Sequence, residues 1–314
     1  MSTRVSPDVQ PHASDKQRSV VVGVDPRGRS ASAVVWAVEE AEREATALTL
    51  VAATRTGSGD DAAGEHDLAA LARRLTMSSL RQTSVQGDPV DALLAAGDDA
   101  DLLVVGARTM RPGQRMLLGS TSRTVAAWSP VPVVVVPEPW MQPSMATSPI
   151  VAGVRPAENA PRDSVGPLDE EVLSFSFARA AALHVPLIVV SAFEPASLAA
   201  WSPSDLLEIR TRHDAELAER LAPWRERHPD LEVIATNVAE PPDHAVLEAA
   251  RVAQLAVVGR HHSTTLSGVL GATARRVLRH ATRPVAVVPS GDRDALAAEV
   301  RMRHGDEIFW APTF

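Results

Sequence analysis

The sequence predicts an α/β protein that contains two tandem copies of one doubly wound domain. The main observation is an internal repeat, in which an apolar run, a glycine-containing loop, a helix start and a second apolar run occur twice. The first copy contains Leu102–Arg108, Gly119–Thr121 and Pro132–Pro137, and the second contains Leu255–His261, Gly271–Thr273 and Pro284–Pro289. Such a repeat is too long for a solenoid unit. The length of 314 residues also suits two domains.

In the first copy, apolar runs predict strands and apolar residues at helical spacing predict helices. The expected strands are residues 19–24, 48–53, 80–85, 102–106 and 133–136. The expected helices begin at Ser30 and Ser120 or span residues 68–75 and 88–96. Trp36 has the spacing of a core residue in the first of these helices. Asp88 is the expected N-cap of the 88–96 helix, with Pro89 in its first turn.

The second copy repeats this order with longer helices. Its expected strands are residues 150–154, 187–192, 231–238, 255–258 and 285–288. Its expected helices are residues 168–183, 205–227, 242–252 and one that begins after Gly271, and a further helix is expected in the tail at 292–303. The predicted organisation is a disordered arm (1–18), domain 1 (19–137), a linker with three prolines (138–149), domain 2 (150–289) and a C-terminal tail (290–314).

Alternating strands and helices imply parallel pairing with helices on both faces of each sheet. Ligands of such sheets bind at the carboxyl ends of the strands, where the winding direction switches. This rule places Asp25, the end of the Leu48 strand and the Gly106 loop around one crevice, and Arg155, Ala192 and the Gly259 loop around another. Pairing of strand 133–136 with strand 285–288 would hide two apolar edges and relate the domains by a pseudo-twofold axis.

Composition narrows the function classes. The net charge of −8, from 31 Lys+Arg against 39 Asp+Glu, argues against a nucleic-acid partner. The sequence has no cysteine, which excludes disulfides and thiolate sites and favours the cytoplasm. Neither a secretory signal nor a membrane-spanning run is expected, so no membrane partner is predicted. His261 and His262 do not predict a metal site, because adjacent side chains point apart and no third ligand is suitably spaced.

The loop after Gly106 has the chemistry of a phosphate-binding segment. Glycines allow close backbone approach, and Ser120 and Thr121 stand at a helix start, where free N–H groups favour anions. Arg108, Arg111 and Arg115 add guanidinium groups. The alternative is an ordinary turn, a serine N-cap and solvated arginines. The common dinucleotide fingerprint and the P-loop motif are both absent.

Together these segments resemble the tandem universal stress protein family of the actinobacterial type. The resemblance rests on the Val21–Asp25 start, the Trp36-Ala37 helix, the Leu-Val-Val-Gly strand, the loop closing on Gly-Ser-Thr and the final Pro-Val-Val-Val-Val-Pro strand. It implies a five-stranded parallel sheet per domain, of the adenine nucleotide alpha hydrolase-like type, with pairing through the last strand. It also implies ATP, with or without Mg²⁺, bound between the first strand, the second strand and the glycine loop.

The resemblance implies a nucleotide site in domain 1. Gly23 and Asp25 would contact the sugar and base side, and Ala53 would line the adenine pocket. The phosphates would be held by Gly106, Arg108, Thr109, Gly119, Ser120 and Thr121. Thr109 stands where nucleotide-binding members of the family have a second glycine.

Domain 2 departs further from the family pattern. The equivalent residues are Gly153, Arg155, Ala192, Gly259, Arg260, Gly271, Ala272 and Thr273, which form a weaker second site. Arg155 replaces the aspartate and His262 replaces the second glycine. Arg155 would either fill the site or recruit a different anion.

The favoured function is a cytosolic stress-response regulator that binds an adenine nucleotide mainly in domain 1. No residue clearly activates water, so binding and signalling are preferred to catalysis, although slow ATP hydrolysis stays open. One alternative is an interaction scaffold with degenerate nucleotide sites. Another is an ATP-consuming transferase, but the Ser-Gly-Gly loop expected after the first strand is replaced by Asp25-Pro26-Arg27-Gly28. The aromatic end, Ile308–Phe314, predicts docking on the protein's own surface or a homodimer or protein-partner contact.

Overall fold

The computed structural model describes residues 18–25, 28–54, 79–109, 116–117, 119–141, 147–156, 169–193, 202–260, 270–291 and 293–304. Five sequence predictions lie outside these residues: the disordered arm as far as residue 17, the helix at 68–75, the roles of Arg111 and Arg115, the His261–His262 pair and the aromatic end of the tail.

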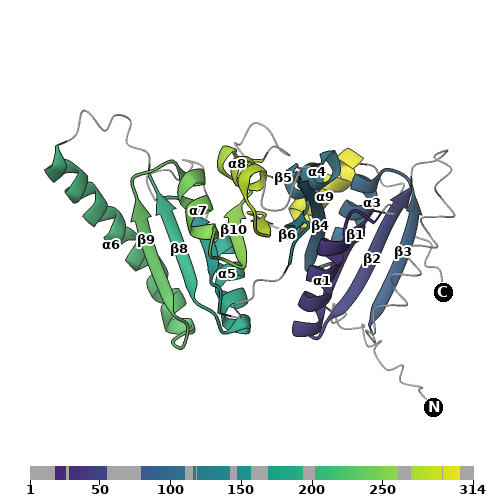
Figure 1. Ribbon diagram of the computed structural model, residues 1–314, viewed down its shortest axis with the longest axis horizontal. Coiled ribbons are helices and arrows are strands. Elements are labelled where there is room, and N and C mark those ends of the chain that lie inside the picture. The colour runs from purple at the N-terminus through teal and green to yellow at the C-terminus, as the bar shows by residue number, and fades with distance from the viewer. Residues whose placement is uncertain are drawn as a thin grey trace, which may run out of the picture.

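One continuous sheet runs through the described chain (Figure 1). Its strand order is β3-β2-β1-β4-β6-β11-β10-β7-β8-β9. The first half of the sheet consists of β1 (Ser19–Val24), β2 (Ala47–Thr54), β3 (Leu80–Gln86), β4 (Leu102–Thr109) and β6 (Val133–Glu138). The second half consists of β7 (Ile150–Val154), β8 (Leu187–Ala192), β9 (Val233–Val238), β10 (Leu255–Gly259) and β11 (Val285–Val288). Within each half the neighbouring strands are parallel, which confirms the predicted fold class.

The two halves join through β6 and β11, the two strands that the sequence predicted to pair, and the structure shows that this pair is antiparallel. Val134 lies opposite Ala286, with Val135 opposite Val285 and Val133 opposite Val287. These apolar edges are buried against each other, so neither is left free to pair with another chain. At this join the strands of the two halves therefore run in opposite directions.

Helices cover both faces of the sheet. α1 (Ala31–Arg43), α5 (Glu170–Leu183) and α6 (Pro203–Arg227) pack on one face, where their apolar residues share a core cluster with Val22, Val134 and Ala286. α3 (Pro89–Gly97), α4 (Ser120–Trp128), α7 (Pro242–Ala250) and α8 (Ala272–His280) pack on the other. Asp88 caps α3 as predicted, because its Oδ1 accepts the N–H of Val90 at 2.8 Å.

The C-terminal helix α9 (Arg293–His304) leaves the second half and packs beside α3 of the first. Arg293 donates to the backbone carbonyls of Asp98 and Ala100, and Arg301 pairs with the Asp98 carboxylate at 2.8 Å. Ala297 and Val300 are buried. The described part of the tail therefore docks on the protein itself.

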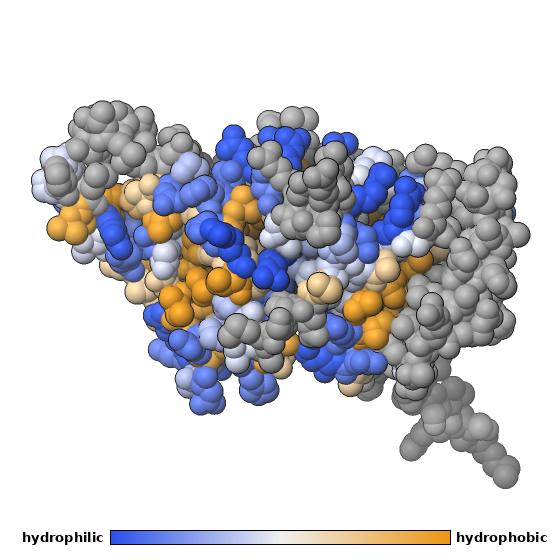
Figure 2. All heavy atoms as spheres, in the orientation of Figure 1, coloured by the Kyte–Doolittle hydropathy of each residue, from blue (hydrophilic) through white to orange (hydrophobic). Residues whose placement is uncertain are grey.

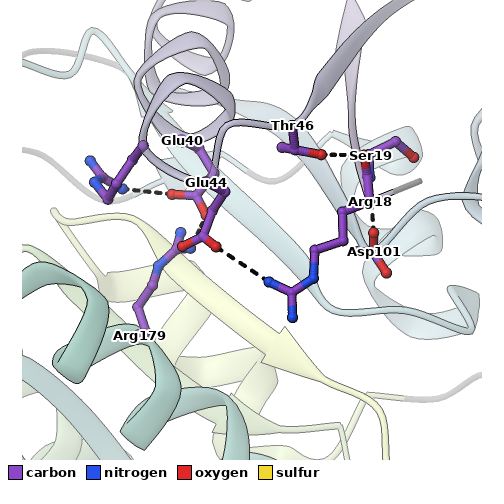
Figure 3. Close-up of polar contacts among 8 residues, drawn as sticks. Arg18, Ser19, Glu40, Glu44, Thr46, Asp101 and Arg179 are labelled. Carbon is purple, nitrogen blue, oxygen red and sulfur yellow. Dashed lines mark hydrogen bonds and ion pairs between the residues drawn. The ribbon is translucent and has the colours of Figure 1, made fainter. Parts of the chain in front are cut away.

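A buried ion pair ties the halves together on the α1–α5 face. Arg179 of α5 donates to the carboxylate of Glu40 on α1, and Arg43 contacts the same carboxylate at 2.6 Å (Figure 3). Burial lowers the pKa of Arg179, and Glu40 opposes this effect. The Arg179 guanidinium also lies 5.1 Å from the ring centre of Trp36, which is buried in the core as predicted.

The outer surface carries both hydrophilic and apolar residues (Figure 2). Figure 2 shows hydrophilic residues interspersed with smaller apolar patches. The exposed large apolar side chains come from separate elements, among them Val35 on α1, Leu207 on α6 and Met302 on α9. Scattered exposure of this kind is ordinary for a folded protein.

Candidate functional site

The predicted site residues of the first half lie at the carboxyl ends of three neighbouring strands. Asp25 directly follows β1, and Ala53 lies near the end of β2. Gly106 lies on β4, the strand between β1 and β6. The structure therefore brings together residues that are far apart in the sequence. This is the sheet edge where ligands of doubly wound folds bind.

Asp25 is held in place from two sides. Its backbone N–H donates to Ser30 Oγ at 2.9 Å, and its carboxylate lies 2.7 Å from Nε of Arg29. The Asp25 side chain keeps 30% of its surface exposed. The carboxylate can therefore still accept hydrogen bonds from a ligand.

The N-terminus of α4 is open. Its N-cap is Gly119, which provides no side-chain cap, and a Cβ built on Gly119 would meet no atom of the described chain within 4 Å. Ser120 is exposed and Thr121 is half-buried. Ser122, which the sequence analysis did not single out, donates from Oγ to the Gly106 carbonyl at 2.6 Å and so fixes this helix start beside β4.

The N-terminus of α1 is occupied instead by a carboxylate from the end of β6. Glu138 accepts the N–H of Ser32 at 2.8 Å and its Oγ at 3.0 Å. This helix start already has its anion, so the one beside Gly106 is better suited to an external phosphate. The sequence analysis missed Glu138 because it assigned that residue to the linker.

Two glycines of the predicted site also serve packing. A Cβ on Gly23 would lie 3.1 Å from Leu93 Cδ1, so Gly23 makes room for α3. A Cβ on Gly106 would lie 3.6 Å from the carbonyl of Arg29, at the start of α1. Both residues therefore fit a structural role as well as a binding role.

The structure corrects the boundary of the glycine loop. The sequence placed Arg108 and Thr109 in the loop, but β4 continues through both residues. They pair with Leu117 and Met116 of a short antiparallel strand, β5 (Met116–Leu117). Arg108 is exposed and lies beside Glu138 of β6 in the strand register.

The second half contains a cavity of about 210 Å³ at the equivalent place. Its walls are mainly apolar and its floor includes glycine backbone. The lining residues are Gly153, Val154, Arg155, Pro156, Val190, Ala192, Pro242, Val246, Val258, Gly259 and Thr273. The structure thus brings together five of the eight residues predicted for the second site: Gly153, Arg155, Ala192, Gly259 and Thr273. Gly271 and Ala272 begin α8 beside Thr273.

Arg260 does not line this cavity, and its predicted place in the second site is corrected. Its side chain is 2% exposed and donates to the backbone carbonyl of Ser129 in the first half. Burial lowers the pKa of Arg260 to about 10, and Glu299 opposes this effect. The residue therefore joins the two halves and points away from the ligand cavity.

A wider crevice of about 410 Å³ lies between the halves, beside the Glu40–Arg179 pair. It is lined by charged groups on α1 and at the start of the sheet, and by Phe175, Ala178 and Ala182 on α5. Figure 3 shows that charged groups here already have partners within the protein. Arg18 lies 3.5 Å from Glu44, and Asp101 accepts the backbone N–H of Ser19 at 2.8 Å.

The described part of the chain contains neither a cluster of metal-binding side chains nor a helix that could span a membrane. No group of three or more His, Cys, Asp or Glu residues could hold a metal ion. No described helix combines the length and apolar character needed to span a bilayer.

Comparisons with known proteins define the class of protein. The model of the universal stress protein family matches residues 17–137 and 166–289. The chain therefore belongs to the universal stress protein family.

Its relatives match along nearly their whole length. A universal stress protein of Mycolicibacterium smegmatis is 30% identical over 88% of this chain and 98% of its own. One from Mycobacterium tuberculosis is 26% identical over 87% of this chain and 97% of its own. Among solved structures, a universal stress protein from Archaeoglobus fulgidus has the same fold, with a TM-score of 0.61 and 18% identity over 87% of this chain and 98% of that chain.

Proposed function

We propose that this protein is a cytoplasmic stress-response regulator that binds an adenine nucleotide, ATP, mainly in domain 1 (residues 19–137). The observation that carries this proposal is the uncapped N-terminus of α4 beside the partly exposed carboxylate of Asp25. The open helix start would take the phosphates, and Asp25 would accept the ribose hydroxyls. Membership of the family supports a stress-related role, and the cysteine-free sequence suits the cytoplasm.

The direct test is to denature the purified chain and chromatograph any nucleotide that it releases, followed by calorimetric titration with ATP with and without Mg²⁺. Gly119→Val should abolish ATP binding, because its branched side chain would occupy the phosphate position. No described atom lies within 4 Å of a Cβ at Gly119, so this variant should still fold. Asp25→Asn is a second variant, with weaker binding expected from loss of the charged acceptor. Unchanged ATP affinity in Gly119→Val would refute the site assignment.

An interaction scaffold without bound nucleotide is the second candidate. Leu93 packs against Gly23, and Arg155 replaces the aspartate in the second half; both observations favour this scaffold role. A chain that neither releases nor binds ATP or ADP would support the scaffold. Turnover of ATP with a co-substrate would instead support a transferase.

A further inference from the structure

The cavity of the second half differs from the first site in the sign of its charged group. At the end of β1 the first half has the carboxylate of Asp25, whereas at the end of β7 the second half has the guanidinium of Arg155. The residue before the next helix differs as well: Ser30 occupies the N-cap position of α1, whereas Asp169 occupies that of α5. Each of these caps accepts the backbone N–H of its strand-end residue, at 2.9 Å from Asp25 and 2.7 Å from Arg155.

Arg155 is fixed in the cavity wall. Its Nε lies 3.2 Å from Oδ1 of Asp169, and its backbone carbonyl accepts a hydrogen bond from Arg220 at 2.8 Å. Within the described chain, its terminal nitrogens Nη1 and Nη2 make no hydrogen bond. The Arg155 side chain is one-quarter exposed, so this end of the guanidinium is available to a ligand.

The carboxylate behind Arg155 is shared. Asp169 is fully buried at its side chain and also lies 3.5 Å from Arg220. One carboxylate therefore contacts two guanidinium groups. Burial lowers the pKa of Arg220, with Asp169 as the largest opposing influence.

The rest of the cavity adds donors and apolar surface. Thr273 lies in the first turn of α8, whose N-cap Gly271 provides no side-chain cap. Val154, Val190, Val246 and Val258 line the walls. The volume of about 210 Å³ is below the range of roughly 300–1,000 Å³ that is usual for drug-sized ligands.

We infer that this cavity binds a small organic anion, one with an apolar body and a single carboxylate or phosphate group. The two free Arg155 nitrogens form a fork that matches such an anion, and the valines enclose its body. Among the described residues at this strand end, no carboxylate takes the place of Asp25 to accept ribose hydroxyls. This inference does not depend on ATP binding in the first half.

The test uses the full chain and three probes that share a ring: benzoate, phenyl phosphate and neutral benzamide. Binding is measured by saturation-transfer NMR, with ATP binding measured in parallel. Both anions should bind the wild-type chain, and the affinity for benzamide should be lower by a factor of about ten or more. ATP bound in the first half should not displace benzoate, and Gly119→Val should lose ATP but keep benzoate.

Two variants separate the charge from the cavity. Arg155→Met should abolish the preference for benzoate over benzamide; Arg220 still contacts Asp169, so this variant should fold. Val246→Leu keeps Arg155 but narrows the cavity. It introduces the residue that α3 has at the equivalent position, Leu93, and it should weaken the binding of all three probes.

Several outcomes would overturn the inference: no binding of either anion, no preference for them over benzamide, an unchanged preference in Arg155→Met, or displacement of benzoate by ATP. A wild-type chain that binds benzoate but not ATP would contradict only the proposed nucleotide function.

Discussion

Glu40 and Arg179 occupy the same position in the two repeats and pair with each other. The N-caps Ser30 and Asp169 precede α1 and α5, and each of the two residues lies ten positions further on. Val134 and Ala286 are likewise equivalent and lie opposite each other in the β6–β11 pair. Both contacts therefore lie at the pseudo-twofold axis. A pairing of two first domains would place Glu40 against Glu40, so the opposite charges favour the pairing of unlike domains.

This relationship predicts the result of charge reversal. Arg179→Glu places two carboxylates at the axis and should destabilise the chain by about 3–5 kcal/mol, the cost of breaking a buried pair. The double variant Glu40→Arg with Arg179→Glu should recover part of this loss, because the pair is restored with its polarity reversed. Urea unfolding measures each variant. The exposed Arg251–Glu248 pair is the matched control, and its reversal should have little effect. No recovery in the double variant would show that charge does not specify the pairing.

Gly153 predicts a steric effect in the second half. A Cβ at this position would lie 2.6 Å from Cγ2 of Val246, a branched side chain that cannot easily move away. Gly153→Ala should therefore cost about 1–3 kcal/mol through overpacking. Adding Val246→Ala should relieve this strain in a double-mutant cycle. Gly23→Ala is the control and should cost less, because it meets the flexible end of Leu93. Equal costs at the two glycines would contradict this account.

Arg260→Met tests the corrected role of that arginine. Arg260→Met leaves the buried carbonyl of Ser129 without its hydrogen bond, so the chain should lose about 1–3 kcal/mol of stability. Because the side chain points away from the cavity of the second half, benzoate binding should not change. Thermal unfolding and NMR titration measure the two effects. A loss of binding at unchanged stability would return Arg260 to the ligand site.

Truncation after Ser290 removes α9. The chain should lose at least about 1.5 kcal/mol, the contribution of burying Val300 alone, and the contacts of Arg293 and Arg301 with the Asp98 segment add to this. Differential scanning calorimetry measures the change. Met302→Ala is the control on the same helix, because Met302 is exposed. If truncation changed neither stability nor oligomeric state, the tail would be left with a role in binding a partner.

Replacing Glu39 should raise the stability of the chain in a way that depends on pH. Burial raises its pKa above the usual 4.5, with Glu42 acting in the same direction and Arg43 opposing. A raised carboxyl pKa means that stability is highest below the ordinary pKa and is lost as the pH rises through the folded-state value. Glu39→Gln should therefore raise the melting temperature near about pH 7 and have little effect near about pH 3. The exposed Glu248→Gln variant is the control. A gain of equal size at both pH values would rule out ionisation as the cause.

Much of the fold could be predicted because it depends on local patterns. The valine runs of β6 and β11 are typical of buried strands. Asp88 and Pro89 are residue types that favour the start of a helix. The candidate site was predicted less completely. Glu138 was missed as the cap of α1 because it lies 106 residues from Ser32, and only folding brings the two together. Ser122 had a local signal, its position in the first turn after Gly119.

The sequence by itself determined the duplication and the parallel strands of each half, because apolar periodicity is a property of each segment. The strand pair that joins the halves followed from the family resemblance and from the need to cover two apolar edges. Only the tertiary structure decided where the charged side chains point. Arg155 and Arg260 follow similar strands of the same half, yet one lines the cavity and the other is buried against Ser129. The direction of a long side chain depends on the partners that packing brings within reach, and those partners come from distant parts of the chain.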